Sequence, residues 1–269
     1  MDLRGWVTMA TMLALALAGC PTGDDDDSSG DDDDDVLTGL TVRGTVHDIA
    51  DFDSNVTDVT VVIADPKPML AFGEEPGVLG ATQPDADGSF QVTGIDASAA
   101  DMGLIMIVDD NGDTYRSAAT GIDLKDYEGY AEGDIVDEQL AFAVTQGYVD
   151  GLDADLAAAG WDGSDIFATG ALMGYVHQDD LTPIPDAVVS STFGGDVFYA
   201  DADPVGSGSF DDGSGTPNAA TDAGGDSLWI APNALVGPWA CEADGYTFDD
   251  FMVGSTAEIL VIIAFRPEA

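Results

Sequence analysis

The sequence predicts an all-β protein built from two tandem antiparallel β-sandwiches. One sequence pattern, typical of a strand that runs into a polar turn, occurs twice, over Val42–Asp48 and Leu172–Asp179. In each case a second strand follows, entered through an aspartate, Asp58 or Asp186. The two copies are offset by 130 residues at the glycines (174 − 44) and by 128 residues at the aspartates (186 − 58). A repeat of this size indicates a duplicated domain and not a solenoid unit.

Length and composition agree with two domains. The chain has 269 residues, and ~100–150 residues per domain is the usual size. A hydrophobic content of 45% is enough for two cores. The predicted layout is a signal peptide (1–19), a lipidated cysteine with an Asp-rich disordered tether (20–37), a first sandwich (38–144), a helical linker (145–168) and a second sandwich (169–269).

The charge balance excludes some partners. Six Lys and Arg stand against 52 Asp and Glu, for a formal net charge of −46. Such a polyanion repels nucleic acid and anionic lipid head groups. The charge favours a host that lives in salt or divalent cations, where the repulsion is screened. A general acidic bias of the host's proteins is the alternative explanation.

The first twenty residues predict a lipid anchor. Arg4 precedes a mostly apolar stretch, Trp6–Leu17, which has the shape of a secretory signal and is too short to span a bilayer. Leu17-Ala18-Gly19-Cys20 resembles the bacterial lipobox, in which the chain is cut before a cysteine that becomes acylated. An ordinary signal peptide with an incidental cysteine is the alternative. Two or more acyl chains anchor a protein stably, so we expect Cys20 to hold the chain to a bacterial envelope membrane, the outer one.

The stretch 21–35 has the composition of an extended tether. It holds nine aspartates and no large apolar residue, so charge repulsion should extend it. At ~3.3 Å per residue it could reach about 50 Å from the membrane. The aspartate runs could attract Ca²⁺, but without fixed geometry such binding would be diffuse.

The strands of the first sandwich are expected where short apolar stretches lie between Gly, Pro and Asp turns. They are 40–46, 59–63, 89–92, 104–108 and 135–144. A short amphipathic helix should follow over 146–159, because Tyr148, Leu152, Leu156 and Ala159 recur at helical spacing.

The second sandwich repeats this order. Gly194-Gly195 should form a two-residue hairpin turn. The composition of the loop 201–226 favours disorder, and a functional loop is the alternative. Leu228-Trp229-Ile230 is matched with Phe90-Gln91-Val92 of the first sandwich. The remaining strands are expected at 188–193, 196–200, 238–243 and 257–265.

Together these residues resemble a known family. The order is Gly-x-Val, a polar turn, an Asp-Ala-Val-Val strand, then Gly-x-Phe or its equivalent, and a strand that ends in Asp-Gly-Tyr, here Asp244-Gly245-Tyr246. This order is similar to the carboxypeptidase regulatory-like domain, a transthyretin-like (prealbumin-like) Greek-key sandwich. The likeness is good over 169–267 and looser over 38–144, which has a proline-rich insertion. The resemblance implies a binding or spacer module without catalysis, and fold alone does not choose between them.

Residues that could carry chemistry are few. His47 and His177 occupy equivalent positions, which favours a shared structural role such as hydrogen bonding to a turn carbonyl. Cys241 is the only thiol left if Cys20 is acylated, and it shares a predicted core face with Trp239. The chain contains neither a Gly-x-Ser-x-Gly nor a His-Glu-x-x-His motif.

Two features suggest ligands. Asp109-x-Asn111-x-Asp113 begins like a Ca²⁺ loop but lacks the glycine and glutamate that an EF-hand needs. An Asp-rich turn is the alternative, so Ca²⁺ is a weak expectation and no other cofactor is expected. If Leu228 and Ile230 face the core, Trp229 points outward and could contact a sugar or a partner. Cover by the long loop or the neighbouring domain is the alternative for Trp229.

We therefore expect a non-catalytic cell-envelope lipoprotein, a structural, adhesive or protein-binding module displayed at a membrane surface. Its expected partners are the membrane, through the anchor, and other envelope proteins or polysaccharide. A carbohydrate-binding module is the second hypothesis, and it requires an exposed Trp229. An enzyme is the third, and it requires a cleft with buried carboxylates or a His–carboxylate pair.

Overall fold

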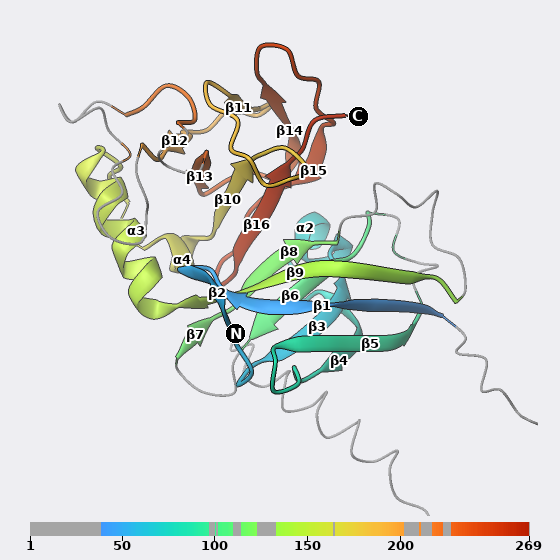
Figure 1. The fold of residues 1–269 in the computed structure, drawn as a ribbon. Coiled ribbons are helices and arrows are strands. Elements are labelled where there is room, and N and C mark those ends of the chain that lie inside the picture. Colours follow the sequence, from blue (N-terminus) through green and yellow to red (C-terminus); the bar gives the residue numbers. More distant parts are fainter. Residues whose placement is uncertain are drawn as a thin grey trace, which may run out of the picture.

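The computed structural model describes residues 39–96, 100, 102–109, 114–122, 133–163, 165–201, 210, 217–222 and 227–268. Strands dominate this part of the chain, and Figure 1 shows how they are arranged. In chain order the elements are β1 (Leu40–Asp48), β2 (Asp51–Asn55), β3 (Thr60–Asp65), α2 (Lys67–Phe72), β4 (Gly77–Thr82), β5 (Ser89–Ile95), β6 (Ile105–Asp109), β7 (Tyr115–Arg116), β8 (Ala118–Gly121), β9 (Ile135–Thr145), α3 (Gln146–Ala158), α4 (Ile166–Thr169), β10 (Ala171–Val176), β11 (Val188–Ser191), β12 (Phe198–Tyr199), β13 (Leu228–Pro232), β14 (Gly237–Glu242), β15 (Phe251–Val253) and β16 (Leu260–Phe265).

Three sheets contain all these strands. We call them the front sheet (β2-β1-β9-β7, with β5 also paired to β1), the long sheet (β12-β13-β10-β16-β8-β6-β3-β4) and the short sheet (β11-β14-β15). The predicted all-β sandwich class is confirmed. Most pairs are antiparallel, but β1–β9, β10–β16 and β8–β16 are parallel.

The duplication is visible in the pairing. In the first repeat β1 lies between β5, antiparallel, and β9, parallel. In the second repeat β10 lies in the same way between β13 and β16. The strands of the opposing sheet correspond as well, since β3-β6-β8 and β11-β14-β15 are both antiparallel runs.

One pairing joins the two repeats. Strand β16 of the second repeat runs parallel to β8 of the first, with Leu260 beside Ala118, Val261 beside Ala119 and Ile262 beside Thr120. The long sheet therefore passes without a break from one repeat into the other, as Figure 1 shows for β10, β16, β8 and β6. No sequence pattern above predicts this junction between the repeats.

The predicted helix is present as α3 and does more than connect the repeats. The Thr145 side chain caps its first turn by accepting a hydrogen bond from the Tyr148 N–H, 3.2 Å away. Tyr148, Leu152 and Leu156 are buried against the second repeat's part of the long sheet. Helix α3 is thus one layer of the core.

An arginine also ties the repeats together. Arg116 Nε donates a hydrogen bond to the Gln146 side chain at the start of α3. The guanidinium carbon of Arg116 lies 5.0 Å from the centre of the Phe167 ring on α4. Such a cation–π contact adds to the hydrogen bond.

Both faces of the long sheet are buried. One face packs against the front sheet in the first repeat and against α3 in the second. The other face carries a continuous cluster that runs from Val62 and Ile107 of the first repeat to Leu172 and Val261 of the second. Because the apolar layers cross the junction, the two repeats pack as one body.

Candidate functional site

Trp229 is not the exposed aromatic that the sequence match suggests. It has no exposed surface. Trp229 pairs with Gly174, and in the first repeat the equivalent Gly44 pairs with Phe90. Trp229 is therefore the counterpart of Phe90, and the sequence match with Gln91 is wrong by one residue. A shift of one residue along a strand moves a side chain to the other face.

The glycine opposite each aromatic explains this arrangement. A Cβ atom at Gly174 would lie 2.8 Å from Trp229 Cζ2 and 2.5 Å from the Ile263 carbonyl oxygen. A Cβ atom at Gly44 would meet the Phe90 ring at 3.0 Å. The repeated glycine thus leaves room for a ring that crosses the neighbouring strand.

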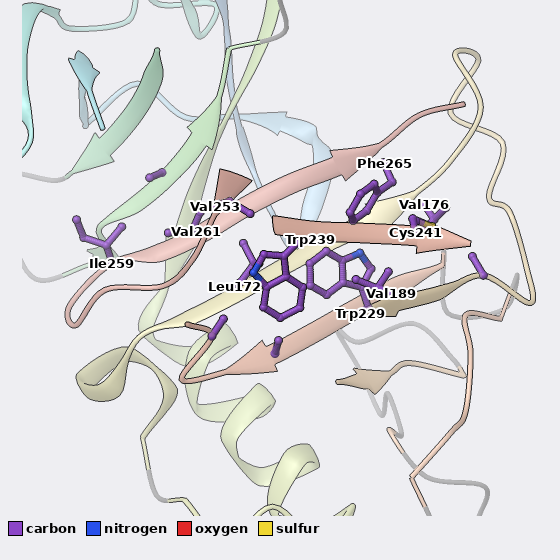
Figure 2. Close-up of a cluster of buried hydrophobic side chains, with 14 of the residues drawn as sticks. Leu172, Val176, Val189, Trp229, Trp239, Cys241, Val253, Ile259, Val261 and Phe265 are labelled. Atoms are coloured by element: carbon purple, nitrogen blue, oxygen red, sulfur yellow. The ribbon is translucent and has the colours of Figure 1, made fainter. Parts of the chain in front are cut away.

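The Trp229 ring lies in the centre of the second repeat's core (Figure 2). It stacks on Trp239 with ring centroids 5.9 Å apart and planes at 20°, and Phe265 lies 6.0 Å away. Trp229 Nε1 is buried and has no hydrogen-bond partner among the described residues. Packing accounts for this tryptophan, so the reason for assigning it a sugar contact is removed.

The two histidines make different local contacts. His177 Nδ1 lies 2.7 Å from the Gln178 carbonyl oxygen, the kind of bond that the sequence predicts, and burial lowers the pKa of this imidazole. His47 Nε2 instead lies 2.8 Å from the Thr45 hydroxyl. Within the described ranges neither ring is hydrogen-bonded to a carboxylate, the partner that a catalytic base needs.

The weak Ca²⁺ candidate lies only partly within the described chain. Asn111 and Asp113 are outside the described residues. Asp109 is buried at the end of β6, and its Oδ1 accepts a hydrogen bond from Ser117 Oγ at 3.0 Å. Among the side chains that the structure describes, no three of His, Cys, Asp or Glu converge into a metal-binding group.

The two cysteines fall in different parts of the chain. Cys20, the expected lipidation site, lies outside the described residues. Cys241 is free and buried beside Trp239, on the core face that the sequence predicts. Burial raises the pKa of the Cys241 thiol to about 12, so the thiol is protonated and unreactive at neutral pH. No described helix has both the length and the apolar character needed to cross a bilayer.

Sheet edges are one kind of place where this fold could bind a partner. An edge strand presents unpaired N–H and C=O groups, and side chains cover two of the edges here. The Tyr199 hydroxyl accepts from the Val189 N–H at 2.8 Å and donates to the Val189 carbonyl at 3.0 Å, which covers the edge of β11. Asn218 donates to the Tyr199 carbonyl at 2.9 Å, which covers β12.

Strand β15 has no such cover. Within the described chain its only ladder partner is β14, and no hydrogen bond reaches its other edge. Phe251 is 38% exposed and Met252 56% exposed. Asp249 and Asp250, both exposed, precede the strand directly. The preceding residues are paired with the C-terminal tail, Phe248 with Pro267 and the Thr247 carbonyl with the Glu268 N–H. The candidate interaction site is therefore the edge of β15 itself, and only a repeat-by-repeat comparison of strand edges could have indicated it from sequence.

Comparisons with known proteins give no family. No family model and no curated protein matches the chain. Among solved structures, the Bacillus anthracis TIE protein is similar at 11% identity and TM-score 0.25, over 85% of this chain and 34% of that one. Shaft pilin SpaA from Lactobacillus rhamnosus GG is similar at 9% identity and TM-score 0.24, over 86% and 98%. The streptococcal ancillary pilin is similar at 10% identity and TM-score 0.25, over 87% and 63%. At these TM-scores the likenesses carry no argument about function.

Proposed function

We propose that this chain is a lipid-anchored, non-catalytic protein of a bacterial cell envelope, which displays its two sandwiches as a protein-binding or structural module. The observation that carries the proposal is Leu17-Ala18-Gly19-Cys20 directly after an apolar signal-like stretch. Acylation at Cys20 would hold the chain to the outer membrane, and the aspartates of 21–35 would keep the sandwiches away from the lipid surface.

The described residues support a role in display. One sheet and its apolar layers pass through both repeats, so the module would be presented as a single stiff body. The polar groups best suited to chemistry have local structural partners: His177 bonds a backbone carbonyl, and Cys241 lies protonated in the core. An open strand edge, β15, offers main-chain groups to a partner.

The carbohydrate-binding alternative is weakened, because it rests on an exposed Trp229. That side chain is inside the core. We therefore favour a protein partner over polysaccharide.

The anchor is tested by changing each cysteine in turn. Cys20→Ser should leave the chain unacylated and move it from the membrane fraction to the soluble fraction. Cys241→Ala is the matched control, since it removes the only other cysteine and should leave acylation and fractionation unchanged. Intact-mass spectrometry of the mature N-terminus gives the direct measurement. An unacylated wild-type N-terminus would contradict the proposal.

A further inference from the structure

We propose that copies of this chain bind one another head to tail. The turn 178–182 of the second repeat in one copy docks on the open outer face of the first repeat's front sheet in the next copy. This contact rests on the proposed function, whose protein partner is then a second copy. The model for it is the junction inside the chain, where a turn of the first repeat lies on the second repeat.

The turns that follow β1 and β10 are equivalent. His47 pairs with Asn55 at the base of the first turn, and His177 pairs with Pro183 at the base of the second. We call the residues between these pairs the first tip (48–54) and the second tip (178–182).

The first tip lies on the second repeat. The ring of Phe52 contacts that of Tyr175 on β10, with centroids 6.1 Å apart. Ile49 is 3% exposed and belongs to the buried cluster that includes α3 and Met173, on the outer face of β10. Inside the chain, a tip of one repeat thus rests on the outer sheet face of the other.

The matching face of the first repeat is open. Thr45 follows the repeated glycine of β1 and is therefore the counterpart of Tyr175. Arg43 lies two residues earlier on the same side of the strand. Leu140 of β9 pairs with Thr45 and is 36% exposed.

Arg43 gives this open face a charge that the chain itself does not neutralise. Within the described chain its guanidinium donates to Gln91 Oε1 at 2.7 Å and has no carboxylate partner, although the sequence holds 52 Asp and Glu. The second tip presents Asp179 and Asp180, both exposed. A tip docked beside Thr45 would bring a carboxylate to this arginine, and such charge-assisted bonds are strong.

Leu181 supplies an apolar anchor at the second tip. Its side chain is 56% exposed, and its φ of 65° lies in the left-handed region. Leucine is uncommon there, and glycine or asparagine would hold the same turn with less strain. A contact with Leu140 of another copy explains why a strained, exposed leucine stands at this position.

The contact joins different surfaces of the two copies. A heterologous interface of this kind leaves a free tip and a free face at the two ends, so further copies can add. The net charge of −46 opposes contact between copies in low salt. Salt screens that repulsion, so association should be favoured in a saline medium.

The test traps the contact with disulfides on membranes of cells that make the full chain. Thr45→Cys and Thr182→Cys are combined with Cys241→Ala, which leaves Cys20 as the only other cysteine. After mild oxidation in about 0.5 M NaCl, which shortens the range of the repulsion, we expect a ladder of dimers, trimers and longer species on non-reducing gels. Each single variant should stay monomeric. Two single variants made in the same cells should stop at dimers, because only the heterologous contact brings positions 45 and 182 together.

Variants of the contact residues sharpen the test. Leu181→Asn should weaken the ladder at least about fivefold without lowering the thermal stability, because asparagine suits the left-handed region. Leu235→Asn is the matched control, since Leu235 is 59% exposed and lies outside the second tip, and it should leave the ladder unchanged.

A charge swap tests the arginine. Arg43→Asp should weaken the ladder at least about fivefold, and adding Asp179→Arg should restore it. Asp179 is chosen because Asp180 accepts a hydrogen bond from the Thr182 N–H at 3.0 Å and so shapes the turn.

The proposal is overturned if the double cysteine variant gives no ladder, if either single variant crosslinks as strongly, or if the charge swap fails to restore the ladder. It is also overturned if Thr45→Cys joins the chain to a different protein instead. A dimer of the Cys241→Ala chain without added cysteines would reveal a free Cys20 thiol. That result would count against the lipid anchor and not against the contact between copies, so the two failures are distinguishable.

Discussion

The two repeats use the same sheet face in opposite ways. In the first repeat the outer face of the front sheet carries Arg43 and Gln91, which hydrogen-bond each other in the solvent. In the second repeat the positions with the same register carry Met173 and Ile230, and α3 covers them. The backbone pairing is shared, so side-chain polarity alone decides whether a face is open or buried.

The strand edges show the same division. Through Ala118 and Ala119 the first repeat pairs with β16, whereas in the second repeat the corresponding strand, β15, begins only at Phe251, after the exposed Asp249 and Asp250. Charges at an edge are a common way to prevent unwanted pairing.

The largest expected effect tests the register that links the repeats. If Trp229 is the counterpart of Phe90, Trp229→Ala and Phe90→Ala should each lower the free energy of unfolding by about 3–5 kcal/mol, because each leaves a large cavity. Gln91→Ala, at an exposed site, should change it by less than about 0.5 kcal/mol. Urea unfolding followed by circular dichroism measures all three. A small effect of Trp229→Ala would instead support the alignment of Trp229 with the exposed Gln91.

The next prediction concerns a variant that places an aspartate, such as the one at position 250, on the buried edge of β8. Ala119→Asp places a carboxylate between β6 and β16, where Ala119 has no exposed surface. We expect a loss of roughly 3 kcal/mol or more, because a buried charge lacks a partner there. Hydrogen exchange should become faster at residues 260–262. Asp250→Ala, the reverse change at the exposed edge, should leave stability nearly unchanged.

A smaller effect is expected at the repeated glycines. Gly44→Ala and Gly174→Ala should each destabilise the fold by about 1–3 kcal/mol, because the added methyl group overlaps backbone and an aromatic ring. Gly151→Ala in α3 is the control. Nothing lies within 4 Å of a Cβ there, so alanine should stabilise the helix by about 0.5–1 kcal/mol. Thermal unfolding of the three variants would show whether both repeats need the glycine.

The smallest effect concerns α3, the helix that covers the second repeat's part of the long sheet. Burial raises the pKa of Asp153, and the nearby Asp165 and Asp150 add to the shift, while the Ile166 N–H bond opposes it. A raised carboxyl pKa in the folded state means that stability falls as pH rises through that pKa. Asparagine at position 153 can still accept the hydrogen bond from the Ile166 N–H. Asp153→Asn should therefore raise the free energy of unfolding by up to about 0.5 kcal/mol at pH 7, a figure that allows for solvent screening.

The gain from Asp153→Asn should vanish at the acid end of a series from pH 3 to pH 7, where the wild-type carboxyl is protonated. Chemical unfolding at each pH measures it. A gain that is constant across the series would show that the charge of Asp153 is not its cause.

Much of the fold could be predicted from local patterns. Turn residues and alternation identify the strands around Phe90 and Trp239, and the 3.6-residue spacing of Leu152 and Leu156 identifies α3. The face of Trp229 could not be predicted in the same way, because all five residues of β13 are buried and the strand shows no alternation of polar and apolar residues. A match by sequence alone can slip by one residue, and that slip exchanges core and surface.

The junction and the candidate site depend on distant pairing. Nothing near Ala118 in the sequence shows that Leu260 will lie beside it, since parallel edge pairing has no local signal. The contrast of Ala118-Ala119 with Asp249-Asp250 could have indicated two different edges, but only once the registers were known. The core position of Cys241, by contrast, followed from simple alternation along β14.

The β8–β16 junction also has a consequence for biogenesis. The ribosome makes residues 118–120 before residues 260–262, so the first repeat is synthesised before the strand that completes its sheet. Until β16 is made, the edge of β8 at Ala118 and Ala119 has unpaired main-chain groups that another unfolded chain could bind. Damage to β16 should therefore cause degradation of the whole chain and not of its last third alone.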